Sequence, residues 1–163
     1  MPDIEVRKAE PSERGDFMRL WKQFIIEDLA NGGDILPSER NLKQMVALWM
    51  LYESKELPGI NVAAFDGDQL IGVTMTGQTP SGSFWLESPR GESVTIWGEY
   101  VLPAYRRRGV SHKMLNLTLE YITKFEGIYF AYTTVQPNVA ATSNALRFGA
   151  TIAGQQIIYE FGS

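Results

Sequence analysis

The sequence predicts a mixed α+β fold, because segments with the periodicity of strands and of helices alternate along one short chain. Their order is strand, helix, helix, two or three strands, helix, strand, helix and strand, as expected for one sheet covered by helices. The chain has 163 residues, of which 44% are hydrophobic and 21% charged, and this suits one globular domain. We therefore expect a single domain over residues 1–163.

The N-terminal third predicts one strand and two helices. Residues 4–8 alternate apolar and polar side chains, as a half-buried strand does. A helix is expected from Pro11 to the stop signal Asn31-Gly32-Gly33, because glycine is common just past a helix end. A second helix is expected to open at Pro37-Ser38 and to end before Pro58.

The middle of the chain predicts a hairpin followed by a long loop. Residues 61–65 and 70–76 are expected to be strands, joined by an Asp-Gly-Asp-Gln turn. Residues 78–92 hold several prolines, glycines and serines, which indicates a loop. Its aromatic residues, Phe84 and Trp85, either wall an acceptor site or pack beneath the loop.

The C-terminal part predicts three strands and two helices. The strands are expected over residues 93–102, 128–135 and 152–161, and the helices over residues 108–125 and 137–148. In residues 93–102, strict alternation would give two faces, one with Thr95, Trp97, Glu99 and Val101 and the other with Val94, Ile96, Gly98, Tyr100 and Leu102.

Composition excludes several classes of function. A net charge of −4 and a pI near 5.1 argue against nucleic-acid binding, which needs a broad basic surface. Without cysteine there is no disulfide framework, thiolate metal site or cysteine nucleophile. His112 is the single histidine, so a histidine-rich metal site is excluded and a Ser-His-Asp hydrolase would rest on that residue alone. We expect no metal.

The sequence contains neither an apolar leader nor a window as apolar as a membrane span. We therefore expect a cytoplasmic protein that does not enter a membrane. The oligomeric state is left open, with a homodimer as one alternative.

An anion site is expected between the strand 93–102 and the following helix. The chain passes Pro103 and three consecutive arginines, and then enters the helix. A helix N-terminus offers backbone N–H groups and the positive end of the macrodipole, and Gly109 allows a ligand to approach the backbone closely. The pattern is typical of a phosphate or pyrophosphate site, although its spacing is neither that of a P-loop nor that of G-x-G-x-x-G.

Glu99 is the candidate catalytic residue. It is the only charged residue in an otherwise apolar or neutral strand, and burial would raise the pKa of its carboxyl toward that of a useful general base. The alternative is a structural glutamate that pairs with an arginine or caps a backbone group. Glu92, just before the strand, is a weaker candidate for the base.

Two motifs resemble those of the GNAT superfamily of N-acetyltransferases. Arg106-Arg107-Arg108-Gly109-Val110-Ser111 follows Val101-Leu102-Pro103 and is similar to the acetyl-CoA signature Gln/Arg-x-x-Gly-x-Gly/Ala, except that Ser111 stands where a second Gly or Ala is usual. Downstream, Asn138, Ala141 and Gly149 have the spacing of a second family motif. The most specific part of the resemblance covers residues 93–150.

The resemblance implies the GNAT acyl-CoA N-acyltransferase fold, with a mostly antiparallel central sheet, and acetyl-CoA as co-substrate. The backbone near Val101 would hold the pantetheine arm and polarise the thioester carbonyl, while the arginine turn would hold the pyrophosphate. Asn138 would contact CoA and could also cap the short helix. The full set of expected cofactor-binding residues is Val101, Arg106, Arg107, Arg108, Gly109, Val110, Ser111, Asn138 and Ser143.

The sequence departs from the family at Ala145. Many members carry a tyrosine seven residues after the asparagine, thought to protonate the departing thiolate, and this chain has alanine there. Ser143, Asn144 and Tyr132 are nearby in the sequence or on the preceding strand, but none occupies the matching position. The general acid is therefore in doubt.

The expected activity is direct transfer of an acetyl group from acetyl-CoA to a primary amine of a small molecule or peptide, with Glu99 as base. A ping-pong route is disfavoured because no cysteine can carry the acyl group. The alternative is a non-catalytic acyl-CoA-binding or regulatory module on the same fold; a phosphoanhydride hydrolase lacks a metal-ligand cluster. The acidic residues that would suit a cationic amine are Glu27, Asp28, Asp34, Glu87 and Glu92.

Overall fold

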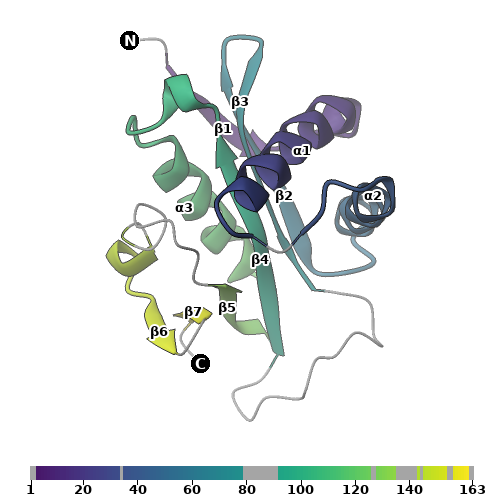
Figure 1. The fold of residues 1–163 in the computed structure, drawn as a ribbon. Helices are drawn as coiled ribbons and strands as arrows, with labels where there is room; N and C mark the ends of the chain where they lie inside the picture. The colour runs from purple at the N-terminus through teal and green to yellow at the C-terminus, as the bar shows by residue number, and fades with distance from the viewer. Residues whose placement is uncertain are drawn as a thin grey trace.

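The computed structural model describes residues 3–33, 35–78, 92–125, 128–134, 143, 145–153 and 156–161. These residues form one seven-stranded sheet with helices on both of its faces (Figure 1). The strands are β1 (Glu5–Lys8), β2 (Gly59–Asp66), β3 (Gln69–Gly77), β4 (Glu92–Val101), β5 (Ile128–Thr134), β6 (Thr151–Ala153) and β7 (Gln156–Glu160).

The strand order is β1-β2-β3-β4-β5-β7-β6. Only the pair of β4 and β5 is parallel among these described strands; the other neighbours are antiparallel. The predicted mixed α+β fold with a mostly antiparallel sheet is therefore confirmed. The parallel pair lies in the middle of the sheet, with α3 as its crossover.

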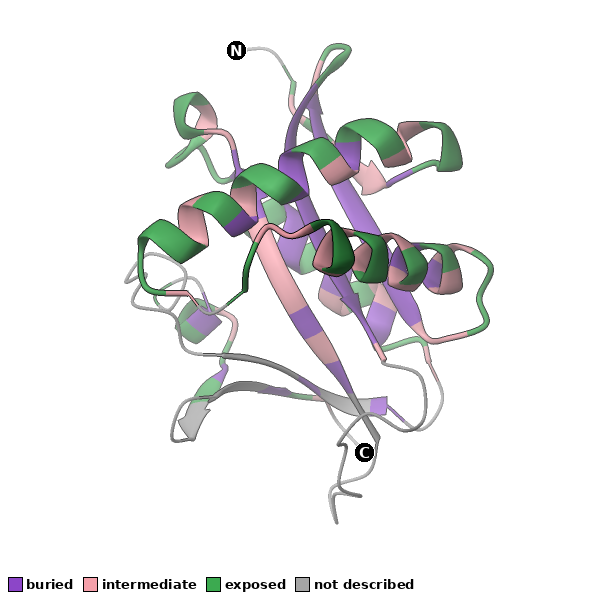
Figure 2. Cartoon of the chain, turned by 45° about the vertical axis from the view of Figure 1, so that its right-hand side comes forward, coloured by how far each residue is buried: buried purple, intermediate pink, exposed green. Residues whose placement is uncertain are grey.

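The sheet divides the interior into two hydrophobic cores, and helices cover the core on each face. The helices are α1 (Arg14–Ala30), α2 (Glu39–Glu53) and α3 (Val110–Ile122), with short 3-10 turns η1 (Pro11–Glu13) and η2 (Pro103–Tyr105). The face under α1 and α2 is rich in aromatic side chains, including Phe17, Trp21 and Trp49. The face under α3 is mainly aliphatic. Figure 2 shows β2 and β3 buried between these layers, while the helices expose their outer sides.

The helix boundaries follow the predicted signals. The side chain of Ser38 accepts a hydrogen bond of 3.2 Å from the backbone of Asn41, so Ser38 caps α2 as expected for a serine at this position. Helix α1 ends at Ala30, and Gly32 follows with a φ of +95°, which favours glycine. At its start, Glu13 pairs with Arg7 at 2.6 Å and thereby fixes η1 against β1.

The C-terminal strand differs from the prediction. In place of one strand over residues 152–161, the chain forms β6 and β7, which pair as antiparallel strands with Ala153 opposite Gln156. The two residues between them lie outside the described part of the chain, but the first of them is Gly154, which is a turn signal. The strand expected over residues 152–161 contains this glycine.

Two further expectations fall largely outside the described residues. The long loop with Phe84 and Trp85 is one of them. Of the helix expected over 137–148, only Ser143 and residues 145–147 are described as helical. Within the described ranges, no helix is long and apolar enough to cross a membrane, and no three His, Cys, Asp or Glu side chains gather to hold a metal ion.

Candidate active site

Strands β4 and β5 diverge in the centre of the sheet. They pair from Glu92 to Thr95 on β4, and β4 then continues to Val101 in contact with β3 alone among the described strands. The backbone N–H of Leu102 donates to the Ile71 carbonyl on β3 at 2.9 Å, so the backbone of Val101 faces the opposite edge, toward β5. Among the described residues, the edge of β4 that faces β5 thus has no neighbouring strand between Ile96 and Val101.

A β-bulge lies where the two strands begin to separate. On β3, Met75 is opposite Gly98 and Thr76 is opposite Ile96, so Trp97 is an extra residue in β4. A bulge bends its strand and increases the local twist. We attribute the divergence of β4 from β5 to this bulge.

The bulge also overturns the predicted alternation along β4. Val94 and Ile96 pack in the core under α3, where Val101 also packs, whereas Trp97 and Tyr100 contact the core under α1 and α2. The prediction that Trp97 shares a face with Val101, and Ile96 with Tyr100, is therefore wrong. The extra residue in the strand shifts the alternation by one position.

Packing on the α1 and α2 face holds the bulge in place. The indole N–H of Trp97 donates to the hydroxyl of Tyr52 at 3.0 Å, and that hydroxyl donates to the Gln78 carbonyl at 2.8 Å. At the next position, a Cβ added to Gly98 would lie 2.4 Å from the ring of Phe24. Any larger residue at position 98 would displace the Phe24 ring of α1, which packs directly on the backbone there.

Glu99 faces the α3 side of the sheet, directly after the bulge. Its carboxylate accepts a hydrogen bond from the hydroxyl of Ser111 in the first turn of α3. The side chain is half-buried. Burial raises the pKa of Glu99 to about 7, and the Ser111 hydrogen bond has a smaller, opposite effect. A carboxyl group with such a pKa can accept a proton near neutral pH.

Tyr159 is a second polar residue near Glu99. It lies on β7 opposite Ala131 of β5, which is in turn opposite Val94 of β4. Burial raises the pKa of Tyr159, and the negative charge of Glu99 raises it further. Tyr159 is not evident as a site residue from the sequence, because its proximity to Glu99 depends on the pairing of β4, β5 and β7. No local pattern in the sequence indicates that pairing.

Helix α3 begins at Val110, after the short segment that follows the end of β4. Gly109 is the N-cap residue with a φ of +77° and a ψ of 6°, a left-handed conformation that favours glycine. The helix has no side-chain cap and no acidic residue in its first turn. The positive end of its dipole is therefore not compensated by a carboxylate of its own first turn.

Arg106 contacts α1 and the end of β4 together. Its Nε donates to the Val101 carbonyl at 2.9 Å, and its guanidinium pairs with Glu27 at 2.8 Å. The guanidinium carbon also lies 5.4 Å from the centre of the Tyr100 ring. The Arg106 hydrogen bond lowers the pKa of Glu27. Glu27, which could have attracted a cationic amine, thus already has a cationic partner.

The other two arginines of the turn are exposed. Arg107 has a φ of +62°, and the Arg108 guanidinium lies 5.2 Å from the centre of the Tyr105 ring. The Tyr105 hydroxyl donates to Asp66 at 2.9 Å. The turn is therefore fixed to the hairpin of β2 and β3, while two cations lie at the surface beside the start of α3.

The remaining predicted site residues have varied positions. The side chains of Val101 and Val110 are buried in the core under α3, so only their backbones are available to a ligand. Ser143 is exposed, and Ala145 is buried in that same core. Asn138 and Ala141 lie outside the described residues. His112 stacks on Phe148 with ring centres 4.5 Å apart, which joins α3 to the segment after the short helix.

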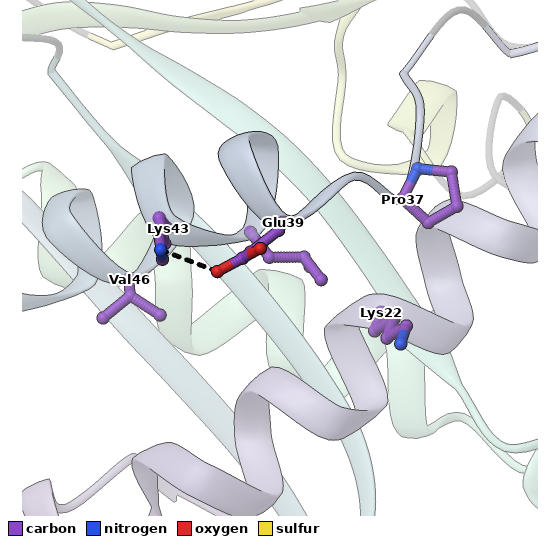
Figure 3. Close-up of a pocket in the computed structure, with 6 residues that line it drawn as sticks. Lys22, Pro37, Glu39, Lys43 and Val46 are labelled. Atoms are coloured by element: carbon purple, nitrogen blue, oxygen red, sulfur yellow. Dashed lines mark ion pairs between the residues drawn. The ribbon is translucent and has the colours of Figure 1, made fainter.

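A separate pocket of about 380 Å³ lies between α1 and α2 (Figure 3). It is lined by Lys22, Pro37, Glu39, Leu42, Lys43 and Val46. Lys43 and Glu39 form an ion pair of 2.7 Å at its rim. None of the lining residues belongs to the predicted site, so this pocket is distinct from the region around Glu99.

The model of the acetyltransferase (GNAT) family matches residues 26–150, which is well over half of the chain. This chain belongs to the GNAT acetyltransferase family. The match includes both motifs that carried the resemblance, and it ends at the residue after Gly149.

Solved structures of GNAT proteins share the fold of this family member. A GNAT family acetyltransferase from Brucella melitensis in complex with acetyl-CoA has a TM-score of 0.67 and 13% identity, covering 100% of this chain and 91% of that one. PaiA N-acetyltransferase from Thermoplasma acidophilum in complex with coenzyme A has a TM-score of 0.68 and 16% identity, covering 99% of each chain. YncA, a putative acetyltransferase from Salmonella typhimurium with acetyl-CoA, has a TM-score of 0.74 and 11% identity, and the match covers 99% of this chain and 95% of that one. No curated protein sequence matches the chain.

Proposed function

We propose that residues 1–163 form one acetyl-CoA-dependent N-acetyltransferase domain that transfers the acetyl group directly to a primary amine of a small molecule or peptide. One observation carries this proposal. The edge of β4 that no described strand pairs leads to the N-terminus of α3, with the half-buried carboxyl group of Glu99 beside both. Family membership supports it, as do the two solved structures of this fold that contain acetyl-CoA. A cytoplasmic location remains our prediction from the sequence.

The fold offers acetyl-CoA two kinds of backbone contact. The backbone N–H of Val101 on this edge of β4 would donate to a carbonyl oxygen of the pantetheine arm, while the Val101 carbonyl accepts from Arg106. The N–H groups of Val110 and Ser111, at the start of α3, would bind the diphosphate. Gly109 has space around it, since an added Cβ would meet no described atom within 4 Å. Close approach of the diphosphate to this backbone is therefore possible.

Side chains would add charge and orientation to these contacts. Arg107 and Arg108 are exposed cations beside the diphosphate position. Arg106 would act mainly by bracing the turn against α1, through Glu27 and the Val101 carbonyl. Asn138 and Ser143, from the second motif, remain proposed contacts to CoA.

In the proposed reaction, Glu99 removes a proton from the amine, directly or through a water molecule. The amine nitrogen forms a bond to the acetyl carbonyl carbon, and the carbon–sulfur bond breaks. The departing thiolate takes its proton from solvent, because Ala145 has no hydroxyl at the family's usual position and is buried in the core. A carboxyl pKa of about 7 lets Glu99 be ionised at the start of the reaction at mildly alkaline pH.

The alternative, a non-catalytic acyl-CoA-binding module, is favoured by the same alanine. The two functions can be separated by measuring thiol release from acetyl-CoA with a panel of polyamines, aminoglycosides and peptides with free N-termini, alongside calorimetry of acetyl-CoA binding. We expect binding together with release on at least one class of amine. Binding without release on any amine would support the module, and an absence of binding would contradict both functions.

A further inference from the structure

We propose that Ser111 is a positioning residue for Glu99, and that its hydroxyl holds the carboxylate in place from the first turn of the cofactor-binding helix. The inference rests on the proposed function, in which Glu99 is the base. The family signature usually has glycine or alanine at this position, and neither has a hydroxyl. Such a contact would therefore be a property of this chain and not of the motif.

Ser111 contacts the proposed base through its hydroxyl and contributes its backbone N–H to the proposed diphosphate site. The Ser111 hydroxyl donates to Oε1 of Glu99, while its backbone N–H lies at the second position of α3, after Gly109 and Val110. The hydroxyl therefore reaches the proposed base, and the N–H belongs to the helix end proposed to hold the diphosphate. Through this one residue, the carboxylate has a fixed position relative to the bound cofactor.

The surroundings of Glu99 make this hydrogen bond important for its charge. Thr74, opposite Glu99 on β3, donates its hydroxyl to the Gly98 carbonyl at 2.8 Å. From β7, Tyr159 lies near the carboxylate, and burial, followed by the negative charge of Glu99, raises the pKa of the tyrosine. Burial raises the pKa of Glu99, and the Ser111 hydrogen bond opposes that effect. Ser111 is thus the described residue on α3 that favours the ionised, reactive form.

Removal of the hydroxyl should therefore change a pH profile as well as a rate. In Ser111→Ala, we expect the acidic limb of kcat/KM for the amine to move upward by roughly one pH unit, because a hydrogen bond to the charged form is lost. The loss of rate should be larger at pH 6.5 than at pH 9. Ser111→Thr keeps the hydroxyl, so its acidic limb of kcat/KM should lie at the same pH as that of the wild type. A merely structural role would lower the rate by the same factor at every pH.

Thr123→Ala is the matched control. Thr123 is an exposed residue at the other end of α3, and its hydroxyl donates to the Glu120 carbonyl at 2.9 Å. This variant removes one hydroxyl from the same helix without a contact to Glu99. We expect its acidic limb to coincide with that of the wild type.

A direct titration separates this inference from the proposed function. The carboxyl pKa of Glu99 can be followed by ¹³C NMR in the ligand-free protein, with Glu99→Gln used to assign its signal. We expect the pKa to rise in Ser111→Ala and in Ser111→Gly, and to stay unchanged in Ser111→Thr. An unchanged or lower pKa in the alanine and glycine variants would overturn the inference. Full activity of Glu99→Gln would instead remove Glu99 as base, while the titration would still decide whether Ser111 controls its ionisation.

Discussion

Arg106 in the arginine turn and Glu27 near the end of α1 form an ion pair of 2.8 Å, although 79 residues separate them in the sequence. Their side chains are 41% and 39% exposed, so the attraction itself stabilises the fold by only about 0–1 kcal/mol. Its importance lies in position, because the same guanidinium donates to the Val101 carbonyl at the end of β4. One side chain thus joins a helix, a strand and the turn proposed to bind the diphosphate.

Arg106→Ala is expected to weaken acetyl-CoA binding by about tenfold, since the turn loses both anchors. Glu27→Gln should also weaken binding, by a smaller factor, if Arg106 acts as a brace. If Arg106 instead binds the diphosphate directly, Glu27→Gln would release the guanidinium and strengthen binding. Calorimetry of acetyl-CoA against both variants distinguishes these roles. Arg19→Ala is the control, because it removes an exposed α1 arginine that pairs with Asp16 at 3.0 Å.

Gly109→Ala should reduce both stability and acetyl-CoA affinity, because alanine is strained at a φ of +77°. The cost in stability is expected to be about 1 kcal/mol. Gly67→Ala is the matched control, since Gly67 has a φ of +59° in the turn between β2 and β3, and its added Cβ would also have space. Both variants should lower the melting temperature, and only Gly109→Ala should weaken binding. Equal affinities in the two variants would argue against a diphosphate at Gly109.

Glu99→Gln should lower kcat by about 10²- to 10⁴-fold, the usual contribution of a general base, with little change in acetyl-CoA affinity. In the wild type, kcat/KM for the amine should fall below a pH of about 7, where the Glu99 carboxyl becomes protonated. The variant should lack this acidic limb. A rate within threefold of the wild type would move the base elsewhere, and Glu92→Gln would be the next variant to measure.

The same substitution is expected to stabilise the fold above neutral pH. The folded protein raises the pKa of Glu99 from 4.5 to about 7, so ionisation of this group opposes folding. The loss of folding stability caused by this ionisation is absent below pH 4.5, grows as the pH rises and is complete above pH 7. Glu99→Gln should therefore be more stable than the wild type at pH 8, by on the order of 1 kcal/mol in the free energy of unfolding, and equally stable below pH 4.5, which thermal unfolding at the two pH values would measure. A gain that does not depend on pH would contradict this account.

The hydroxyl groups of Ser143, Tyr132 and Tyr159 are expected to contribute little to protonation of the thiolate. Ser143→Ala, Tyr132→Phe and Tyr159→Phe should each lower kcat by less than about tenfold, or about 1.4 kcal/mol of barrier. Acetyl-CoA affinity should stay within a small factor in the two tyrosine variants. Steady-state rates at saturating substrates provide the measurement. A loss in one of them as large as that of Glu99→Gln would identify a side-chain acid and refute solvent protonation.

Much of the fold was predictable because its signals are local. Ser38 caps α2, Gly32 follows the end of α1, and the Asp-Gly-Asp-Gln turn joins β2 to β3, as the sequence indicates. Predicted helix and strand ends agree with α3 and β5 to within a few residues. In each case the residues that determine the element are neighbours in the chain.

The features that the sequence did not reveal depend on contacts between distant segments. The bulge at Trp97 exists only relative to Met75 and Thr76 on β3, so regular alternation gave the wrong faces for β4. Likewise, the proximity of Tyr159 to Glu99 and the pair of Arg106 with Glu27 arise from packing between elements far apart in sequence. Local propensity contains no information on either of them.

The extra residue at the bulge makes the site depend on the number of residues in β4 as well as on their chemistry. Ile96 and Glu99 are an odd number of residues apart, yet both face α3. In a regular strand, residues an odd number apart face opposite sides of the sheet. A chain that lost one residue here could keep nearly the same composition and strand propensity, but it could not keep both the core contact of Ile96 and the hydrogen bond that Ser111 donates to Glu99. Deletion of a single codon would thus turn the carboxylate to the other face of the sheet, away from the proposed cofactor site. A relative with such a deletion could still keep this fold.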